Sequence, residues 1–117
     1  MEHYARQGEV LILRLPDDTP EPHGWAALAP EGEHLIVGHS ETGHHHVLER
    51  EAARILVDPK PPAGLTVLRA IVERPHEMRH LRGHDTHTAI PMAPGVYEIR
   101  TPVEFDHYAE LARRVAD

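Results

Sequence analysis

The sequence contains no cysteine, no asparagine and a single serine, Ser40. The absence of cysteine excludes disulfides, thiolate metal sites and cysteine nucleophiles. A serine hydrolase of the Ser-His-Asp type would have to use Ser40. Without asparagine, the chain has no acceptor for N-linked glycosylation. These absences remove several common classes of enzyme and secreted scaffold.

Aromatic residues and long apolar stretches are also scarce. One tryptophan, three tyrosines and one phenylalanine occur, so the core must be built mainly from valine, leucine, isoleucine and alanine. No apolar stretch reaches the ~18 residues of a membrane span. The first ten residues lack the apolar segment of a secretory signal. We therefore expect a cytoplasmic protein with no membrane partner.

Positive charge is limited and dispersed, whereas histidine is abundant. Eleven arginines and Lys60 are scattered along a chain with a formal net charge of −7. No basic run marks a nucleic-acid footprint, so we expect no nucleic-acid partner. The chain has twelve histidines, and the histidine side chain has a reference pKa of ~6.5. The sign of the net charge therefore depends on pH in the mildly acidic range, which leaves a pH-sensitive role open.

The 117 residues suit one globular domain over 1–117. Eleven prolines and eight glycines interrupt the chain, and the short runs between them are rich in valine, isoleucine and leucine. This pattern favours strands over helices. The expected strands cover residues 8–15, 33–40, 44–50, 54–57, 65–73, 86–90 and 96–101. They predict an all-β fold, a small antiparallel barrel or sandwich of about seven short strands.

Turn residues predict two hairpins. Residues 41–43 end on Gly43 and form a tight loop between the second and third strands. The turn Pro91-Met92-Ala93-Pro94-Gly95, residues 91–95, joins the last two strands. Trp25 is expected to anchor the proline-rich segment 16–30 to the sheet. Apolar residues at helical spacing over 105–112 predict a short C-terminal helix.

The histidine triplet at 44–46 begins the third predicted strand. Because side chains alternate along a strand, His44 and His46 share one face and can present two imidazoles to one ion. Neutral imidazole suits zinc and iron. His39 lies across the loop, and His84 and His87 form a second group before the last turn. We predict a transition-metal site, zinc or iron, from these five histidines, with solvated or subunit-contacting histidines as the alternative.

The spacing of His44 and His46, followed by Glu49 or Glu51, is similar to the first motif of the cupin barrels. Cupins hold a metal with two histidines, a glutamate and a later histidine. The glycine and proline positions around His84 and His87 depart from the second cupin motif. The resemblance implies an alternative function, a cupin-like metalloenzyme using His44, His46 and His84 or His87.

A threefold assembly would need fewer metal ligands from each chain. Three copies of one His-x-His pair around an axis supply six imidazoles, an octahedral site of the kind seen in trimeric phage fibres. Such a closed site has no open coordination position and suits a structural role.

Residues 76–80 read His-Glu-Met-Arg-His, the H-E-x-x-H pattern of zinc peptidases. On a helix, His76 and His80 would bind zinc on one face, with Glu77 as general base. Pro75 and Gly83 are typical ends of a short helix, so the segment 74–84 is ambiguous between helix and loop. A match to this pattern is expected by chance roughly once in eight chains of this histidine and glutamate content. A zinc peptidase is therefore a remote alternative.

Three stretches of the chain look familiar together: QGEVLILRLP at 7–16, IVGHSETGHHHVLE at 36–49 and HDTHTAIPMAPGVYEIR at 84–100. The chain resembles a group of small uncharacterised bacterial and phage-borne proteins with a GHSETGHHH core and an I-x-(L/M)-x-P-G-x-Y turn. The resemblance implies a compact β fold and a virion or assembly component, such as a head-decoration or fibre-associated protein. We therefore expect a non-catalytic structural or binding protein, a homo-oligomer with other virion proteins as partners, located in the cytoplasm or the virion.

Overall fold

The computed structural model describes residues 1–38, 45–81 and 88–103, and these residues form ten strands and no helix. The strands are β1 (Glu2–Gln7), β2 (Val10–Leu15), β3 (Ala26–Ala27), β4 (His34–Gly38), β5 (His46–Glu49), β6 (Ala53–Val57), β7 (Leu65–Val72), β8 (His76–His80), β9 (Ile90–Met92) and β10 (Gly95–Pro102). In the part of the chain described, no helix is long and apolar enough to cross a membrane.

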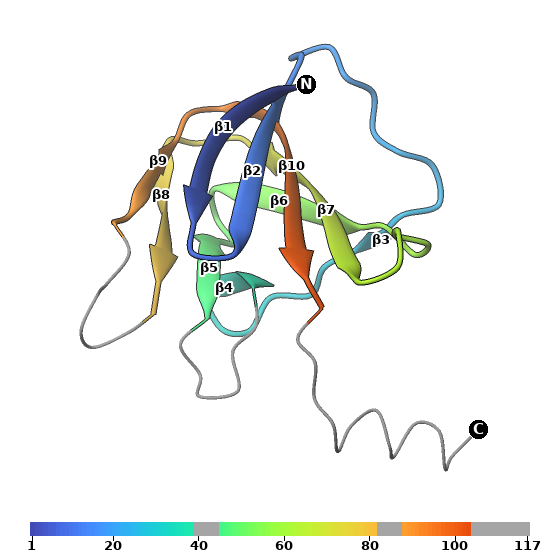
Figure 1. Ribbon diagram of the computed structural model, residues 1–117. Helices are drawn as coiled ribbons and strands as arrows, with labels where there is room; N and C mark the ends of the chain where they lie inside the picture. The colour runs from blue at the N-terminus through green and yellow to red at the C-terminus, as the bar shows by residue number, and fades with distance from the viewer. Residues whose placement is uncertain (39–44, 82–87, 104–117) are drawn as a thin grey trace.

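All the strands pair antiparallel in two sheets (Figure 1). The larger sheet has the order β1-β2-β10-β7-β6-β3, and the smaller has the order β4-β5-β8-β9. Both sheets keep open edges, so the fold is a sandwich and not a closed barrel. The all-β prediction is confirmed, with ten strands in place of about seven. The predicted C-terminal helix lies outside the described residues.

The core lies between the two sheets and follows the alternation of the strands. In β2, β7 and β10 the residues that belong to the core lie at alternate positions and are aliphatic apart from Tyr97, whereas the positions between them face outward. Ile12, Leu68 and Ile99 meet Leu48 and Met78 from the smaller sheet. Each aliphatic side chain buried in this way contributes about 2 kcal/mol relative to an exposed one.

The sequence left the segment 74–84 open between helix and loop, and its described part is neither. Residues 76–80 form β8, which pairs with β5 on one side and β9 on the other. Met78 is fully buried, and Glu77 and Arg79 are exposed on the opposite face. Burial that alternates with a period of two is typical of a strand. Pairing with two neighbouring strands stabilises this segment more than a proline and a glycine at its ends would stabilise a helix of two turns.

The prediction of a hairpin between the last two strands is also wrong. β9 pairs with β8 in the smaller sheet, and β10 pairs with β2 and β7 in the larger one. Ala93 and Pro94 therefore carry the chain from one sheet to the other, and the rest of the predicted turn belongs to β9 and β10. The residues of a proline-containing turn do not show whether the two flanking strands pair with each other or enter different sheets, because pairing depends on distant residues.

The sheet-to-sheet turn is held by Arg14, Tyr97 and Gly95. The Arg14 guanidinium lies 4.7 Å from the centroid of the Tyr97 ring and donates hydrogen bonds to the carbonyl oxygen of Pro94 at 3.4 Å. The Tyr97 hydroxyl donates to the carbonyl oxygen of Ala93 at 2.6 Å, and burial raises the pKa of Tyr97. A Cβ on Gly95 would overlap the Arg14 guanidinium. The P-G-x-Y pattern of the sequence is therefore a packing motif.

The proline-rich segment is anchored by Trp25, as predicted. The Arg69 guanidinium lies 5.3 Å from the centroid of the Trp25 ring. On the same outer face, Glu98 is 7% exposed and accepts a 2.7 Å hydrogen bond from Arg100 Nε. Arg69 lies 3.9 Å from Glu98 as well, so two guanidinium groups compensate one buried carboxylate.

We expect the substitution Gly95→Ala to reduce the free energy of unfolding by about 2 kcal/mol. The added Cβ would overlap Arg14, and the Gly95 φ of 153° is one that residues with a side chain rarely adopt. Urea unfolding followed by Trp25 fluorescence measures the loss. Gly64→Ala is the matched control, because Gly64 also has a positive φ, 81°, but open space around it. If Gly95→Ala costs the same with and without Arg14→Ala, the overlap is not the cause.

Candidate functional site

The candidate site is a pair of stacked histidines at one end of the smaller sheet. His46 begins β5 and His80 ends β8, and the two residues are partners in the ladder between these strands. Their ring centroids are 4.4 Å apart with an interplanar angle of 20°. His46 shares a strand face with the core residue Leu48, and His80 with Met78. The pair therefore faces the larger sheet.

A buried glutamine from the larger sheet holds His46. Gln7, at the end of β1, is 1% exposed. Its amide nitrogen donates to the carbonyl oxygens of Met78 at 3.2 Å and Thr88 at 3.1 Å, and its oxygen lies 2.9 Å from His46 Nδ1. The two carbonyl acceptors fix which side of the amide is nitrogen, so the oxygen must accept from Nδ1–H. In neutral His46 this places the proton on Nδ1 and the lone pair on Nε2.

Gly38 is the second support of the His46 ring. It pairs with His46 in the ladder between β4 and β5. A Cβ on Gly38 would lie 2.9 Å from Val10 Cγ2 and 3.0 Å from His46 Cδ2. A side chain at this position would force the imidazole away from the sheet. The first glycine of the GHSETGHHH core therefore has a packing reason.

Two histidine-bearing segments start at this end of the smaller sheet. Gly38 ends β4 beside His46, and His46 lies beside His80. The next residue, Leu81, donates its backbone N–H to the carbonyl oxygen of His45 at 2.8 Å. The chain thus enters 39–44 and 82–87 from neighbouring positions. The predicted ligands His39, His44, His84 and His87 lie in these segments, outside the described residues; His46 is the one predicted ligand inside them.

The described residues alone do not supply a complete set of metal ligands around His46. No group of three histidine, aspartate or glutamate side chains able to hold a metal ion occurs among those residues. Glu49 lies three positions from His46 on β5 and therefore on the opposite face. There it pairs with Arg79 at 3.7 Å. The cupin alternative therefore cannot use Glu49 together with His46.

The H-E-x-x-H residues do not form a zinc site on β8. His76 and His80 lie four residues apart on a strand, which separates their Cα atoms by roughly 13 Å. His76 Nδ1 lies 2.9 Å from the carbonyl oxygen of Arg74, and Glu77 is exposed on the other face. The geometry that a zinc peptidase needs from these three residues is absent, because the segment is a strand.

Gln7 and the stacking of His80 on His46 were not predicted from the sequence. Gln7 is the only glutamine of the chain and stands between a charged strand and a turn, which is a typical surface context. Its partners are 39 to 81 residues away. A sequence pattern of short range carries no signal for such contacts. His80 was visible only as part of the H-E-x-x-H pattern.

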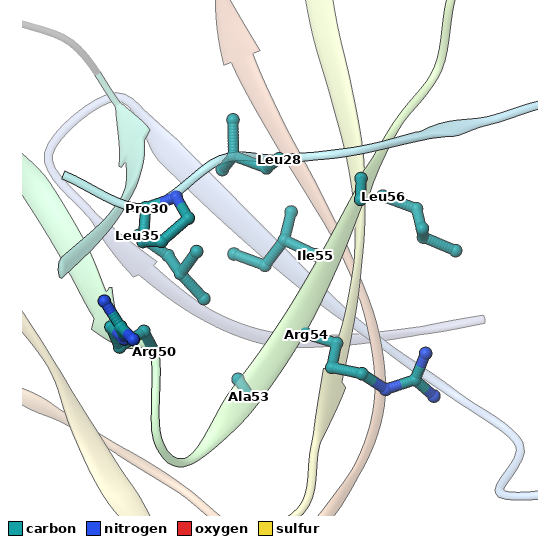
Figure 2. A pocket seen from close by; sticks show the side chains of 9 residues that line it. Leu28, Pro30, Leu35, Arg50, Ala53, Arg54, Ile55 and Leu56 are labelled. Atoms are coloured by element: carbon teal, nitrogen blue, oxygen red, sulfur yellow. The ribbon is translucent and has the colours of Figure 1, made fainter. Parts of the chain in front are cut away.

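A second feature is an apolar pocket of about 260 Å³ between β3, β4 and β6 (Figure 2). It is lined by Ala27, Leu28, Pro30, Leu35, Arg50, Ala53, Arg54, Ile55 and Leu56. Figure 2 shows Leu35 and Ile55 pointing toward each other from the two sheets, while Arg54 and Leu56 lead away. Arg54 donates to Glu21 at 2.6 Å, and this hydrogen bond raises the pKa of Arg54.

We expect Gln7→Leu to lower the free energy of unfolding by about 3 kcal/mol. The substitution leaves the carbonyl oxygens of Met78 and Thr88 and the Nδ1–H of His46 without their present partner. Urea unfolding measures the loss, and a Gln7→Leu, His46→Ala double variant should lose less than the sum of the single changes.

The ¹⁵N shifts of the His46 ring give an independent readout of the same hydrogen bond. Wild-type protein should carry the proton on Nδ1, and Gln7→Leu should lose this preference. A wild-type ring protonated on Nε2 alone would contradict the assigned arrangement.

Comparison with known proteins places the chain in one family. Residues 6–102 match the family described as "Domain of unknown function (DUF8820)". This match spans every strand of the sandwich except the first residues of β1. No curated protein and no solved structure matches the chain. Because the match covers most of its length, the chain belongs to the DUF8820 family of domains of unknown function.

Proposed function

We propose that the protein is a non-catalytic structural or binding protein that holds a transition metal, zinc or iron, at the His46 end of the sandwich. The observation that carries this proposal is the hydrogen bond between Gln7 and His46 Nδ1. Histidines that bind metals usually donate their other ring N–H to a fixed acceptor, which sets the tautomer and the orientation of the ring. Gln7 supplies such an acceptor from a buried position.

The further ligands that we propose are His39, His44, His84 and His87. The support is topological: residues 39–44 lie between Gly38 and His45, and residues 82–87 lie between Leu81 and Thr88. Leu81 donates to the carbonyl oxygen of His45, and Gln7 donates to that of Thr88. Imidazoles without thiolates suit zinc and iron. His80 is a positioning residue in this proposal, because its ring stacks on His46 and fixes the imidazole plane.

Self-association is the second part of the proposal. A metal shared around a threefold axis would take one histidine set from each of three chains, and the histidine cluster would then also line the subunit contact. The support is the composition of β2, whose Leu11 and Leu13 are only half-buried on the outer face. With the resemblance to phage-borne proteins, we propose a virion or assembly component, such as a head-decoration or fibre-associated protein, with other virion proteins as partners.

We expect His46→Ala to abolish metal binding and the stability that metal adds. Protein purified without a histidine tag or a nickel column is analysed for metal by mass spectrometry, and its melting temperature is measured with zinc and with a chelator. A hundredfold excess of zinc over its Kd should raise the melting temperature of the wild type by roughly 10 °C. His44→Ala should lose the same response.

Two variants control this experiment. His23→Ala removes an exposed histidine of the proline-rich segment and should leave the metal content unchanged. His80→Phe keeps a ring on His46 but removes both nitrogens, so retained metal identifies His80 as a positioning residue and lost metal identifies it as a ligand. Wild-type protein that contains no metal and melts at the same temperature with and without zinc would refute the proposal.

We expect the molecular mass in solution to depend on the metal if the site is shared between chains. Light scattering coupled to size exclusion measures the mass of wild type and His46→Ala at equal protein concentration. The wild type should exceed the 13.2 kDa of one chain, and chelation or His46→Ala should lower its mass. A metal-loaded protein that remains at the mass of one chain would restrict the site to a single subunit.

A further inference from the structure

The apolar pocket lies at the end of the sandwich that is opposite the stacked histidine pair. The edges of the two sheets leave a gap there. β3 and β6 border it from the larger sheet, and Leu35 of β4 borders it from the smaller one. Its floor belongs to the core, because Leu35, Ala53 and Ile55 are all at least 95% buried. Ala27 and Pro30 at the rim are exposed, so the cavity opens to solvent.

The size and lining of the pocket restrict its ligand. Pockets for drug-sized molecules have volumes of about 300 to 1,000 Å³, and this one has about 260 Å³. It therefore suits a smaller molecule. Aside from the two arginines, every lining side chain is apolar. The inner part of the ligand must be a hydrocarbon, because this floor offers no side-chain donor or acceptor to a polar group.

The two arginines at the pocket differ in their partners. Arg54 forms ion pairs with Glu21 and Glu73, and its side chain leads away from the cavity (Figure 2). Arg50 donates one hydrogen bond, to the carbonyl oxygen of Gly32 at 3.2 Å. Among the described residues, no carboxylate forms an ion pair with Arg50. In a chain of net charge −7, Arg50 is thus a cation at the pocket with donors left for an anion.

We propose that this pocket binds a small aliphatic carboxylate, with the hydrocarbon between Leu35 and Ile55 and the carboxylate on the Arg50 guanidinium. A planar guanidinium accepts a carboxylate with two parallel hydrogen bonds, whereas a hydroxyl or an amine lacks this match. Free short-chain acids and the C-terminal residue of a peptide share this chemistry.

The test is a titration of ¹³C-labelled methyl groups by NMR with hexanoate, hexanol, hexylamine and acetyl-leucine. Hexanoate should saturate one site and shift the methyl signals of Leu28, Leu35 and Ile55. Hexanol has the same tail without the charge and should bind at least tenfold more weakly. Hexylamine places a cation beside Arg50 and should not bind. Acetyl-leucine binding tighter than hexanoate would identify a peptide terminus as the source.

Arg50→Gln is the decisive variant, and Arg6→Gln is its control. Both arginines are exposed, so neither change should affect folding, which the melting temperature checks. Arg6 does not line the pocket. Arg50→Gln should weaken hexanoate binding at least tenfold and leave hexanol binding unchanged, whereas Arg6→Gln should leave both unchanged.

Three results would overturn the proposal. The first is hexanoate at millimolar concentration shifting no methyl signal of the pocket. The second is hexanoate shifting signals outside the pocket only. The third is equal hexanoate affinity for wild type and Arg50→Gln.

Discussion

The hydrogen bonds of Gln7 are the constraint on which the rest of the structure depends. One buried amide joins the end of β1 in the larger sheet to β8, to residue 88 and to His46. A buried amide is costly unless it is satisfied, and here the nitrogen has two acceptors and the oxygen one donor. The same group therefore sets the position of the two sheets at this end and the protonated nitrogen of the His46 ring. An apolar residue at position 7 would achieve neither.

The sequence patterns of the chain have two kinds of explanation: some residues are needed for packing, and others carry groups that can bind a ligand. Gly38 and Gly95 are both places where a side chain would displace a neighbour, the His46 ring in one case and the Arg14 guanidinium in the other. Tyr97, two residues after Gly95, forms the aromatic surface for Arg14. The P-G-x-Y pattern is thus accounted for by the connection between the sheets. Packing also explains Gly38 in the GHSETGHHH core, and His46 of that core has Gln7 as an orienting partner.

Local pattern was sufficient for β2, β4, β7 and β10, because each alternates or is apolar over its length and has a glycine or proline at one of its ends. It failed for β1 and β8, whose sequences EHYARQ and HEMRH are polar. Those two strands form because their neighbours offer ladder partners, and that information lies far away in the sequence. The prediction of the candidate site was incomplete for the same reason. His46 was predicted, but the contacts of Gln7 and the stacking of His80 depend on the sheet order.

The two proposed binding features lie at opposite ends of β5. His46 begins β5, and Arg50 directly follows the end of that strand, so their backbones are roughly 13 Å apart. A catalytic group must come within about 3 to 3.5 Å of the reacting atoms. A metal on His46 and a carboxylate on Arg50 could not act on one bond across that distance. Glu49 lies between them on the opposite face, paired with Arg79, and cannot serve as a shared acid or base. Each end of β5 therefore carries one of the two proposed binding groups, and the two sites are tested independently.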